Sequence, residues 1–273
     1  MGTQFLEHDG GRIAFDDTGS GPLVVCVPGM GDLRAEYRFL TPQLVAVGYR
    51  VVTMDVRGHG ESSVGWRDVS VAAIGSDILA LIRHLSAGPA IIVGTSMAAG
   101  AAVCVAAEAP EAVAGLVLIG PFVRDMMPGW QRSAMFNTMF LRPWGASIWS
   151  RYFATLYPTA RPADWDAYTA AQNRNLRERG RLETLRRMMV ATKQASEAAL
   201  SQVDAPVLVL MGTKDPDFNN PAAEARLVAD RLHGGVQMIE GAGHYPHAEM
   251  PTQTGAAIVV FLNSCQEPAR HVA

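Results

Sequence analysis

Short apolar runs alternate with longer segments of helical periodicity along most of this chain. The first such run, residues 23–27 (LVVCV), is apolar at every position, which is typical of a strand covered on both faces. Further strands are predicted at residues 51–54, 91–93, 116–119, 207–210 and 236–239, and a strand pair at residues 5–6 and 12–15. Helices are predicted at residues 39–47, 71–85 and 97–107, and after Pro221 and Pro251.

This alternation predicts an α/β fold, a mostly parallel, doubly wound sheet with helices on both faces. One segment, residues 124–201, has helical periodicity without a strand signal and holds four of the five tryptophans. We interpret it as an inserted all-helical cap, with residues 1–123 and 202–273 forming the core. Ligands of such sheets bind beyond the carboxyl ends of the strands, so the functional residues are expected there.

Aromatic side chains are the most frequent large apolar groups of the predicted cap. Most are expected to pack the cap onto the sheet domain, but some should line a substrate pocket, because such pockets are mostly apolar. The candidates for substrate binding are Trp130, Phe136, Phe140 and Trp144.

Composition and charge argue against several classes of protein. The formal net charge is −3, and no Lys/Arg run is present, so neither nucleic acid nor a membrane surface is an expected partner. Cys26, Cys104 and Cys265 are odd in number and far apart, which indicates buried thiols in a reducing compartment. Without a signal peptide or membrane span, we expect a cytoplasmic monomer or homodimer, with a loose polar tail at residues 266–273.

One serine lies where a buried strand runs into a helix of small residues, in the stretch VGTSMAAG. Gly94 and Ala98 lie two positions on either side of Ser96. A sharp strand-to-helix turn needs tiny residues at these flanks because larger side chains would collide. A serine that only caps a helix has no such requirement. The pattern therefore favours Ser96 as a nucleophile at the carboxyl edge of the sheet.

At this turn the sequence resembles the α/β-hydrolase family, whose motif is G-x-S-x-G, with Ala98 here in place of the second glycine. The resemblance covers residues 5–263 and is weakest in the cap. It implies a histidine that activates the serine and a carboxylate that orients the histidine, in the order Ser, acid, His. Asp215, after the strand at residues 207–210, and His244, in GAGHYPH, take these places.

The acid has two alternatives. Asp217 lies two residues further from the strand end, and Asp125 lies in the GPFVRD loop, where some relatives of the family keep the acid. His247 matches the histidine motif less well than the glycine-flanked His244. A metal site at His244, His247 and Glu249 lacks a partner with ligand spacing, and no nucleotide motif is present, so no metal or cofactor is expected.

The resemblance also implies two backbone N–H donors for an oxyanion. These are Met97, directly after the serine, and Met30, in the loop VPGMGD. Relatives usually carry a histidine where this chain has Pro28, so the sequence leaves open which residue supports the loop. The stretch DVRGHGES also resembles the family, and its implied role is structural.

The implied function is a serine hydrolase that cleaves carboxylic esters or lactones of small to medium apolar substrates through an acyl-enzyme on Ser96. The same residues would serve a C–C bond hydrolase, a thioesterase or amidase, or a cofactor-free perhydrolase. A ligand-sensing regulatory protein with slow hydrolysis is an alternative of another class. A serine at this turn, rather than an aspartate, argues against epoxide opening and removal of halide.

Overall fold

A computed structural model describes residues 2–266, so the expected tail lies outside the described residues apart from Gln266. Its eight strands form one sheet in the order β1-β2-β4-β3-β5-β6-β7-β8. The strands are β1 (Gln4–His8), β2 (Gly11–Thr18), β3 (Leu23–Val27), β4 (Arg50–Met54), β5 (Ala90–Thr95), β6 (Val113–Ile119), β7 (Val207–Gly212) and β8 (Gly235–Ile239). Only β2 runs antiparallel to its neighbours, β1 and β4. The predicted α/β fold with a mostly parallel sheet is confirmed.

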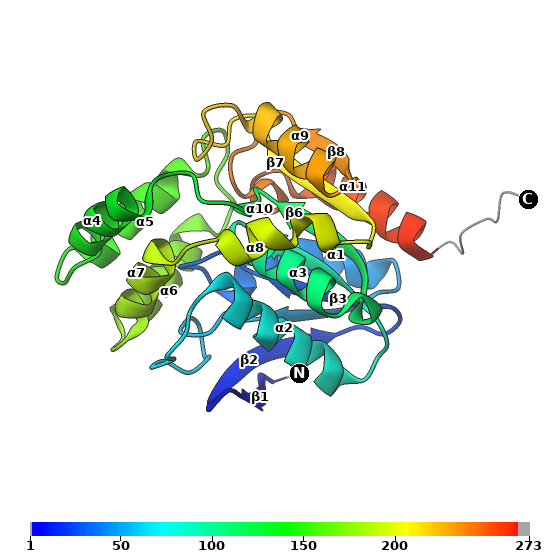
Figure 1. Cartoon of the computed structure of the whole chain (residues 1–273), viewed down its shortest axis with the longest axis horizontal. Coiled ribbons are helices and arrows are strands. Elements are labelled where there is room, and N and C mark those ends of the chain that lie inside the picture. Colours follow the sequence, from blue (N-terminus) through cyan, green and yellow to red (C-terminus); the bar gives the residue numbers. More distant parts are fainter. Residues whose placement is uncertain (1, 267–273) are drawn as a thin grey trace, which may run out of the picture.

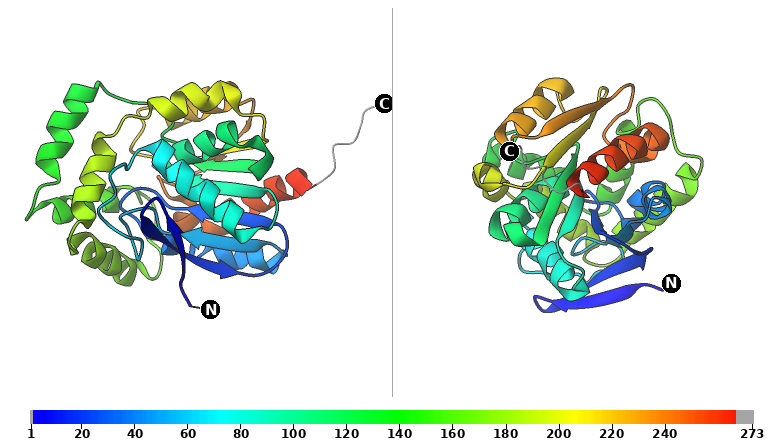
Figure 2. Two further views of the ribbon diagram at one scale, coloured as in Figure 1. Left: turned by 60° about the horizontal axis from the view of Figure 1, so that its bottom comes forward. Right: turned by 90° about the vertical axis from the view of Figure 1, so that its right-hand side faces the viewer.

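The apolar runs form strands because their side chains enter two separate cores. In β3, Val25 and Val27 belong to one apolar cluster, and Val24 and Cys26 to the other. Helices on one face are α2 (Val71–Leu85), α3 (Met97–Glu108), α8 (Gln194–Ala199) and α9 (Pro221–Arg231). On the opposite face lie α1 (Leu40–Ala46) and α11 (Pro251–Gln266), as the right-hand view of Figure 2 shows. The sheet is therefore covered on both sides.

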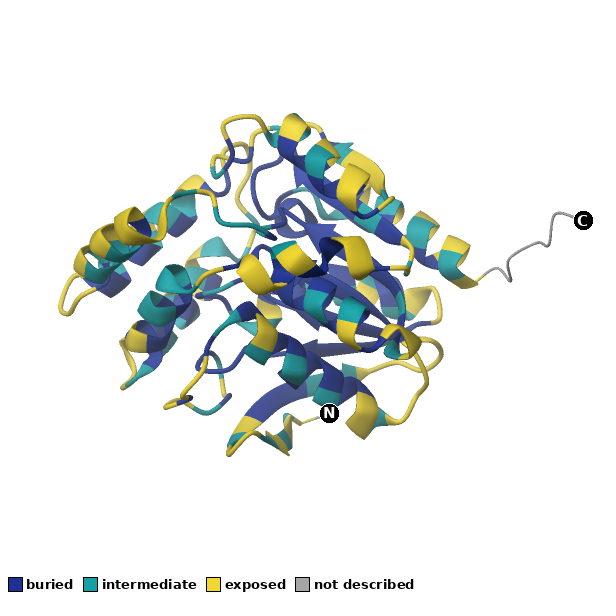
Figure 3. Ribbon diagram, in the orientation of Figure 1, coloured by how far each residue is buried: buried dark blue, intermediate teal, exposed yellow. Residues whose placement is uncertain are grey.

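Helices alone make up the regular structure between β6 and β7 in the described chain. Four of them lie together beyond one end of the sheet (Figure 1): α4 (Gly129–Met139), α5 (Gly145–Thr155), α6 (Trp165–Arg177) and α7 (Arg181–Val190). We call these four helices the cap helices, and their outer faces are exposed whereas the central strands are buried (Figure 3). The next helix, α8, packs on α3 and α2 of the core, and the predicted boundary at residue 201 falls within the 3-10 helix η3 (Leu200–Gln202).

Three short helices complete the fold. They are η1 (Arg34–Tyr37), η2 (Pro110–Ala112) and α10 (Pro246–Glu249). All three cysteines are free thiols, and Cys26 is fully buried between β4 and β5. Between residues 2 and 266, no helix combines the length and the apolar character needed to cross a lipid bilayer.

A buried ion pair joins the loop after β4 to α2. Arg57 is completely buried and donates two hydrogen bonds of 2.7 Å to the carboxylate of Asp77. We expect Asp77→Ala to lower the free energy of unfolding by about 3–5 kcal/mol, because it leaves a buried guanidinium without its main counter-charge. Urea unfolding measures this. The double variant Arg57→Met, Asp77→Leu should regain most of the loss, and an Asp77→Ala variant as stable as the wild type would contradict the expectation.

Candidate functional site

Ser96 lies where β5 ends and α3 begins, in a backbone conformation that side chains rarely adopt (φ 58°, ψ −120°). Its amide donates to the Ile119 carbonyl (2.8 Å) and its carbonyl accepts from the Phe122 amide (3.1 Å), so the end of β6 and the loop after it hold the turn. A Cβ on Gly94 would lie 2.7 Å from the Ala98 carbonyl oxygen. The turn therefore requires a glycine at position 94, the first of the two small flanks that the sequence contains.

The hydroxyl of Ser96 is not used as a helix cap. Ser96 occupies the N-cap position of α3, but its side chain makes no capping hydrogen bond. Throughout residues 2–266 we find no other hydrogen bond made by this hydroxyl. The residue is 6% exposed and borders a cavity beneath the cap helices. The strained turn thus presents an unengaged hydroxyl to that cavity.

His244, in the loop after β8, borders the same cavity as Ser96. Its Nδ1 lies 2.7 Å from Oδ2 of Asp215, and both side chains are buried. The His244 amide donates to the Leu156 carbonyl (3.0 Å), which fixes the loop. At Gly120 (φ 51°), a Cβ would lie 2.8 Å from the His244 ring, so the end of β6 needs a glycine there. When Nδ1–H is donated to Asp215, Nε2 of the neutral ring becomes the acceptor.

The two alternative acids make different contacts. Asp217 Oδ2 lies 3.7 Å from His244 Nδ1, while Asp217 Oδ1 accepts a hydrogen bond from the Tyr152 hydroxyl (2.6 Å). Asp125 accepts from the Thr192 hydroxyl (2.7 Å) and from a backbone amide of the turn before α8. Asp215 is therefore the carboxylate in direct contact with the imidazole, Asp217 a second charge nearby, and Asp125 part of a different cluster.

These carboxylates change the protonation of His244. Burial opposes the charged ring, but Asp215 and Asp217 outweigh it and raise the pKa of His244 to about 9. Burial also raises the pKa of Asp217 above its usual value. The site therefore stabilises an imidazolium, which is the form that a histidine takes once it has accepted a proton.

The loop after β3 lies against Ser96, since a Cβ on Gly29 would be 3.4 Å from Ser96 Cβ, and it contains one unengaged amide. The Gly29 amide donates to Glu36 Oε2 (2.9 Å) and the Gly31 amide to His59 Nε2 (3.0 Å). The amide of Met30, between them, has no acceptor within the described residues, and Met30 borders the cavity. Glu36 and His59 thus support the loop in which Pro28 replaces the usual histidine. The sequence pattern missed Glu36, since nothing local links it to Gly29.

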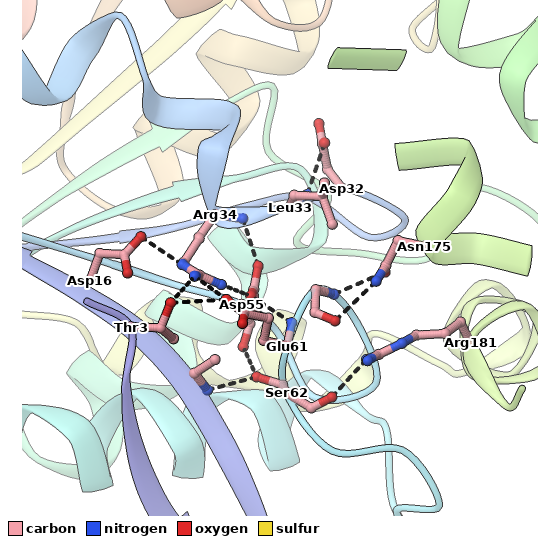
Figure 4. Close-up of polar contacts among 12 residues, drawn as sticks. Thr3, Asp16, Asp32, Leu33, Arg34, Asp55, Glu61, Ser62, Asn175 and Arg181 are labelled. Atoms are coloured by element: carbon pink, nitrogen blue, oxygen red, sulfur yellow. Dashed lines mark hydrogen bonds and ion pairs between the residues drawn. The ribbon is translucent and has the colours of Figure 1, made fainter. Parts of the chain in front are cut away.

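The stretch DVRGHGES carries out the structural role that was expected of it. Asp55 accepts hydrogen bonds from the amides of Arg34 (2.7 Å) and Glu61 (2.9 Å), as Figure 4 shows. The Ser62 hydroxyl donates to the Asp55 carbonyl (2.8 Å), and Arg181 of α7 donates to the Ser62 carbonyl (2.6 Å). Residues 55–62 therefore join the loop after β3 to the cap helices.

His247 and Glu249 do not border the cavity. His247 Nε2 lies 2.9 Å from Glu36 Oε1, and Glu249 accepts the Gly243 amide (2.6 Å). Among the described residues, one group of three has donor atoms within 4.8 Å of one another: Asp215, Asp217 and His244. In that group Nδ1 of the histidine is already hydrogen-bonded to Asp215.

The cavity has a volume of about 330 Å³ and a mostly apolar wall. Six of the thirteen methionines contribute to it: Met30, Met126, Met127, Met135, Met139 and Met189. Met97, by contrast, is the first residue of α3, and its side chain is buried in the apolar core and does not border the cavity. Because methionine is flexible and polarizable, such a wall adapts to ligands of different shape.

Two of the four predicted substrate-binding aromatics border the cavity, Phe136 and Phe140. The other two do not. Trp130 is 72% exposed, because it lies six residues before Phe136 on α4 and so points about 120° away around the helix. Trp144 is 47% exposed, and its indole N–H donates to the Thr138 carbonyl (3.3 Å). Instead, Trp149, Tyr152 and Tyr245 border the cavity, which side-chain composition alone did not indicate.

Several known proteins are similar to this chain in sequence or in structure. A protein of Mycobacterium tuberculosis, named provisionally as the non-heme bromoperoxidase BpoC, is 30% identical over 93% of this chain and 98% of its own. The 2-(acetamidomethylene)succinate hydrolase of Mesorhizobium japonicum is 28% identical over 94% of both chains. A thermophilic esterase from Thermogutta terrifontis superposes with a TM-score of 0.81 at 22% identity, over 98% of this chain and 100% of its own.

The profile of the alpha/beta hydrolase fold family matches residues 22–251, which hold Ser96, Asp215 and His244. The match spans most of the core and the whole cap, and the TM-score supports the same fold over nearly the full chain. The chain belongs to the alpha/beta hydrolase fold family.

Proposed function

We propose that the protein hydrolyses carboxylic esters or lactones of small to medium, largely apolar substrates through an acyl-enzyme on Ser96. The observation that carries the proposal is the unengaged Ser96 hydroxyl on a strained turn, on the same apolar cavity as the His244–Asp215 pair. The esterase name of one structural neighbour and the hydrolase name of one relative support this choice of chemistry.

In the proposed reaction, the oxygen of Ser96 attacks the carbonyl carbon of the substrate while His244 Nε2 takes the hydroxyl proton. Asp215, bound to Nδ1, orients the ring and stabilises its positive charge. The proton then passes to the leaving alcohol as the ester bond breaks. A water molecule, deprotonated by the same nitrogen, then attacks the acyl-enzyme. As the bond between the acyl group and Ser96 breaks, His244 gives the proton to the Ser96 oxygen.

The negative oxygen formed during attack needs donors, and the amides of Met30 and Met97 are proposed for this role. Met97 is the first residue of α3, where the helix dipole is positive. The Met30 amide lies between two amides that are held by Glu36 and His59. Holding both neighbours keeps the central amide directed to one position, so the donor needs no reorganisation during the reaction.

The support by Glu36 is testable. We expect Glu36→Leu to lower kcat by about 100-fold with KM changed by less than about threefold, because the lost support displaces a donor that acts on the transition state. Glu36→Gln keeps a side-chain oxygen for the Gly29 amide and should stay close to wild type. Steady-state kinetics, with thermal unfolding as a check on folding, measures both. A Glu36→Leu variant that raises KM but keeps kcat would contradict this role.

A panel of substrates tests the proposed function itself. The purified protein is assayed with 4-nitrophenyl esters of increasing acyl length and with aliphatic lactones. We expect saturable turnover of the esters, with kcat/KM peaking at an acyl length that fills the cavity. Efficient covalent labelling of Ser96 by a fluorophosphonate, with negligible turnover of every substrate, would instead favour the ligand-sensing alternative.

Cofactor-free perhydrolase activity is a second candidate, favoured by the bromoperoxidase name of the 30% identical relative. In that reaction hydrogen peroxide, instead of water, would take the acyl group from Ser96 and give a peracid. Formation of peracid from an ester and hydrogen peroxide, followed by bromination of a dye, measures it. A peracid rate that exceeds hydrolysis at equal saturation would favour this candidate.

A further inference from the structure

A second group of charged side chains borders the cavity, apart from His244 and Asp217. Arg124, Asp125, Arg132 and Lys193 border the same cavity as Ser96. They come from the loop after β6, from α4 and from the turn before α8. Charges at the wall of a buried cavity are costly unless they are paired, so the pairing of each one matters.

Both arginines are already engaged. Arg124 donates to Glu224 of α9 (Nε to Oε1, 3.0 Å), outside the cavity wall. Arg132 Nη1 lies 2.6 Å from Asp125 Oδ1, and Arg132 Nε donates to the Val190 carbonyl (3.0 Å). Each arginine therefore has a carboxylate of its own.

Lys193 has no such partner. The residue is only 6% exposed, and its backbone amide, not its ammonium, is bonded to Asp125 (3.0 Å). In the part of the chain that the structure describes, the Lys193 ammonium makes neither a hydrogen bond nor an ion pair. Burial lowers the pKa of Lys193, against the pull of Asp125. Within this group Asp125 pairs with Arg132 and Glu224 pairs with Arg124, so the Lys193 ammonium is the cation left without a carboxylate of its own.

We propose that Lys193 binds a carboxylate carried by the substrate, so that the preferred substrates are esters of an apolar chain or ring that bears one free carboxylate. This proposal rests on the proposed function, and it specifies the substrate class of the same cavity. A carboxylate would supply the acceptor and the negative charge that this ammonium at the cavity wall lacks. The charge of the one unpaired ammonium complements one carboxylate of the substrate. The methionine-rich wall offers apolar contacts to the rest of the substrate.

The test compares two esters of equal acyl length, mono-4-nitrophenyl glutarate and 4-nitrophenyl pentanoate. We expect Lys193→Met to raise KM for the glutarate ester about tenfold or more and to leave the pentanoate ester nearly unchanged, because only the former loses a buried charge partner. Arg174→Met, which removes an exposed charge from α6, is the matched control and should alter neither. Equal effects of Lys193→Met on the two esters, or no effect on the glutarate ester, would overturn the proposal.

A second measurement does not depend on hydrolysis. Pentanoate alone, which has one carboxylate on an apolar chain, should raise the melting temperature of the wild type and of the Arg174→Met variant, but not that of Lys193→Met. If the wild type turns over neither ester, the proposed function fails while this binding test still decides on Lys193. Stabilisation of all three proteins by pentanoate to the same extent would show that the anion binds elsewhere and would overturn the proposal.

Discussion

Replacing Ser96 with alanine is expected to lower kcat for a 4-nitrophenyl ester by about 10⁶-fold. Only the hydrolysis that the protein supports without this nucleophile should remain. The reason is that no other hydroxyl or thiol borders the cavity in the described chain except those of Tyr152 and Tyr245. Burial holds the pKa of both tyrosines above the usual value, so neither replaces the nucleophile. Initial rates at saturating ester measure the effect.

The folding of the variant should be unaffected. Alanine at this position keeps the same backbone conformation (φ 58°) and the same Cβ, and no hydrogen bond of the hydroxyl is lost. Its melting temperature should therefore match that of the wild type. Ser20→Ala, at an exposed turn, is the control and should keep full activity. Turnover by Ser96→Ala at the wild-type rate, or labelling by fluorophosphonate at another residue, would refute the acyl-enzyme on Ser96.

Asp215→Asn is expected to lower kcat by about 10⁴-fold, because the amide no longer stabilises the imidazolium or fixes the tautomer of His244. Asp217→Asn should lower kcat far less, since Asp217 Oδ2 lies 3.7 Å from Nδ1 and its other oxygen is held by Tyr152. Measuring kcat of the two variants under identical conditions shows which carboxylate contributes more to the reaction. A larger loss from Asp217→Asn than from Asp215→Asn would assign the orienting role to Asp217.

The pH profile distinguishes the two roles further. His244 acts as a base only when neutral, so kcat/KM of the wild type should rise with pH until the pH passes the pKa of about 9. Asp217 is one of the carboxylates that raise this pKa, so Asp217→Asn should shift the rising limb to lower pH. Asp166→Asn, at an exposed position of α6, should leave the limb in place. An unshifted limb in Asp217→Asn would mean that its charge does not reach the ring.

The sheet was predictable from the sequence because strands such as β3 are apolar at every position, and only a sheet with two covered faces buries such runs. The turn at Ser96 was predictable for a local reason, since Gly94 lies two residues before the serine and a Cβ there would meet the backbone of Ala98, two residues after it. Both features are encoded over short distances along the chain.

Other parts of the site depend on contacts across the fold. Trp130 and Trp144 carry the same chemistry as the aromatics that border the cavity, but which face of a cap helix meets the cavity is decided by how the four helices pack. The His59–Gly31 contact joins residues 28 positions apart, and no local sequence pattern predicts it. The unpaired ammonium of Lys193 is likewise evident only from the structure, in which Asp125 forms its ion pair with Arg132.

The methionine-rich wall also limits the oxidants that the cavity tolerates. Six methionine thioethers border this cavity. Thioethers react with peroxide to give sulfoxides, which are polar and larger. An enzyme that drew hydrogen peroxide to Ser96 would expose its own binding surface to progressive damage at each turnover. The wall that adapts to different acyl groups is therefore better suited to water as the second substrate, and it makes the binding surface sensitive to the redox state of its surroundings.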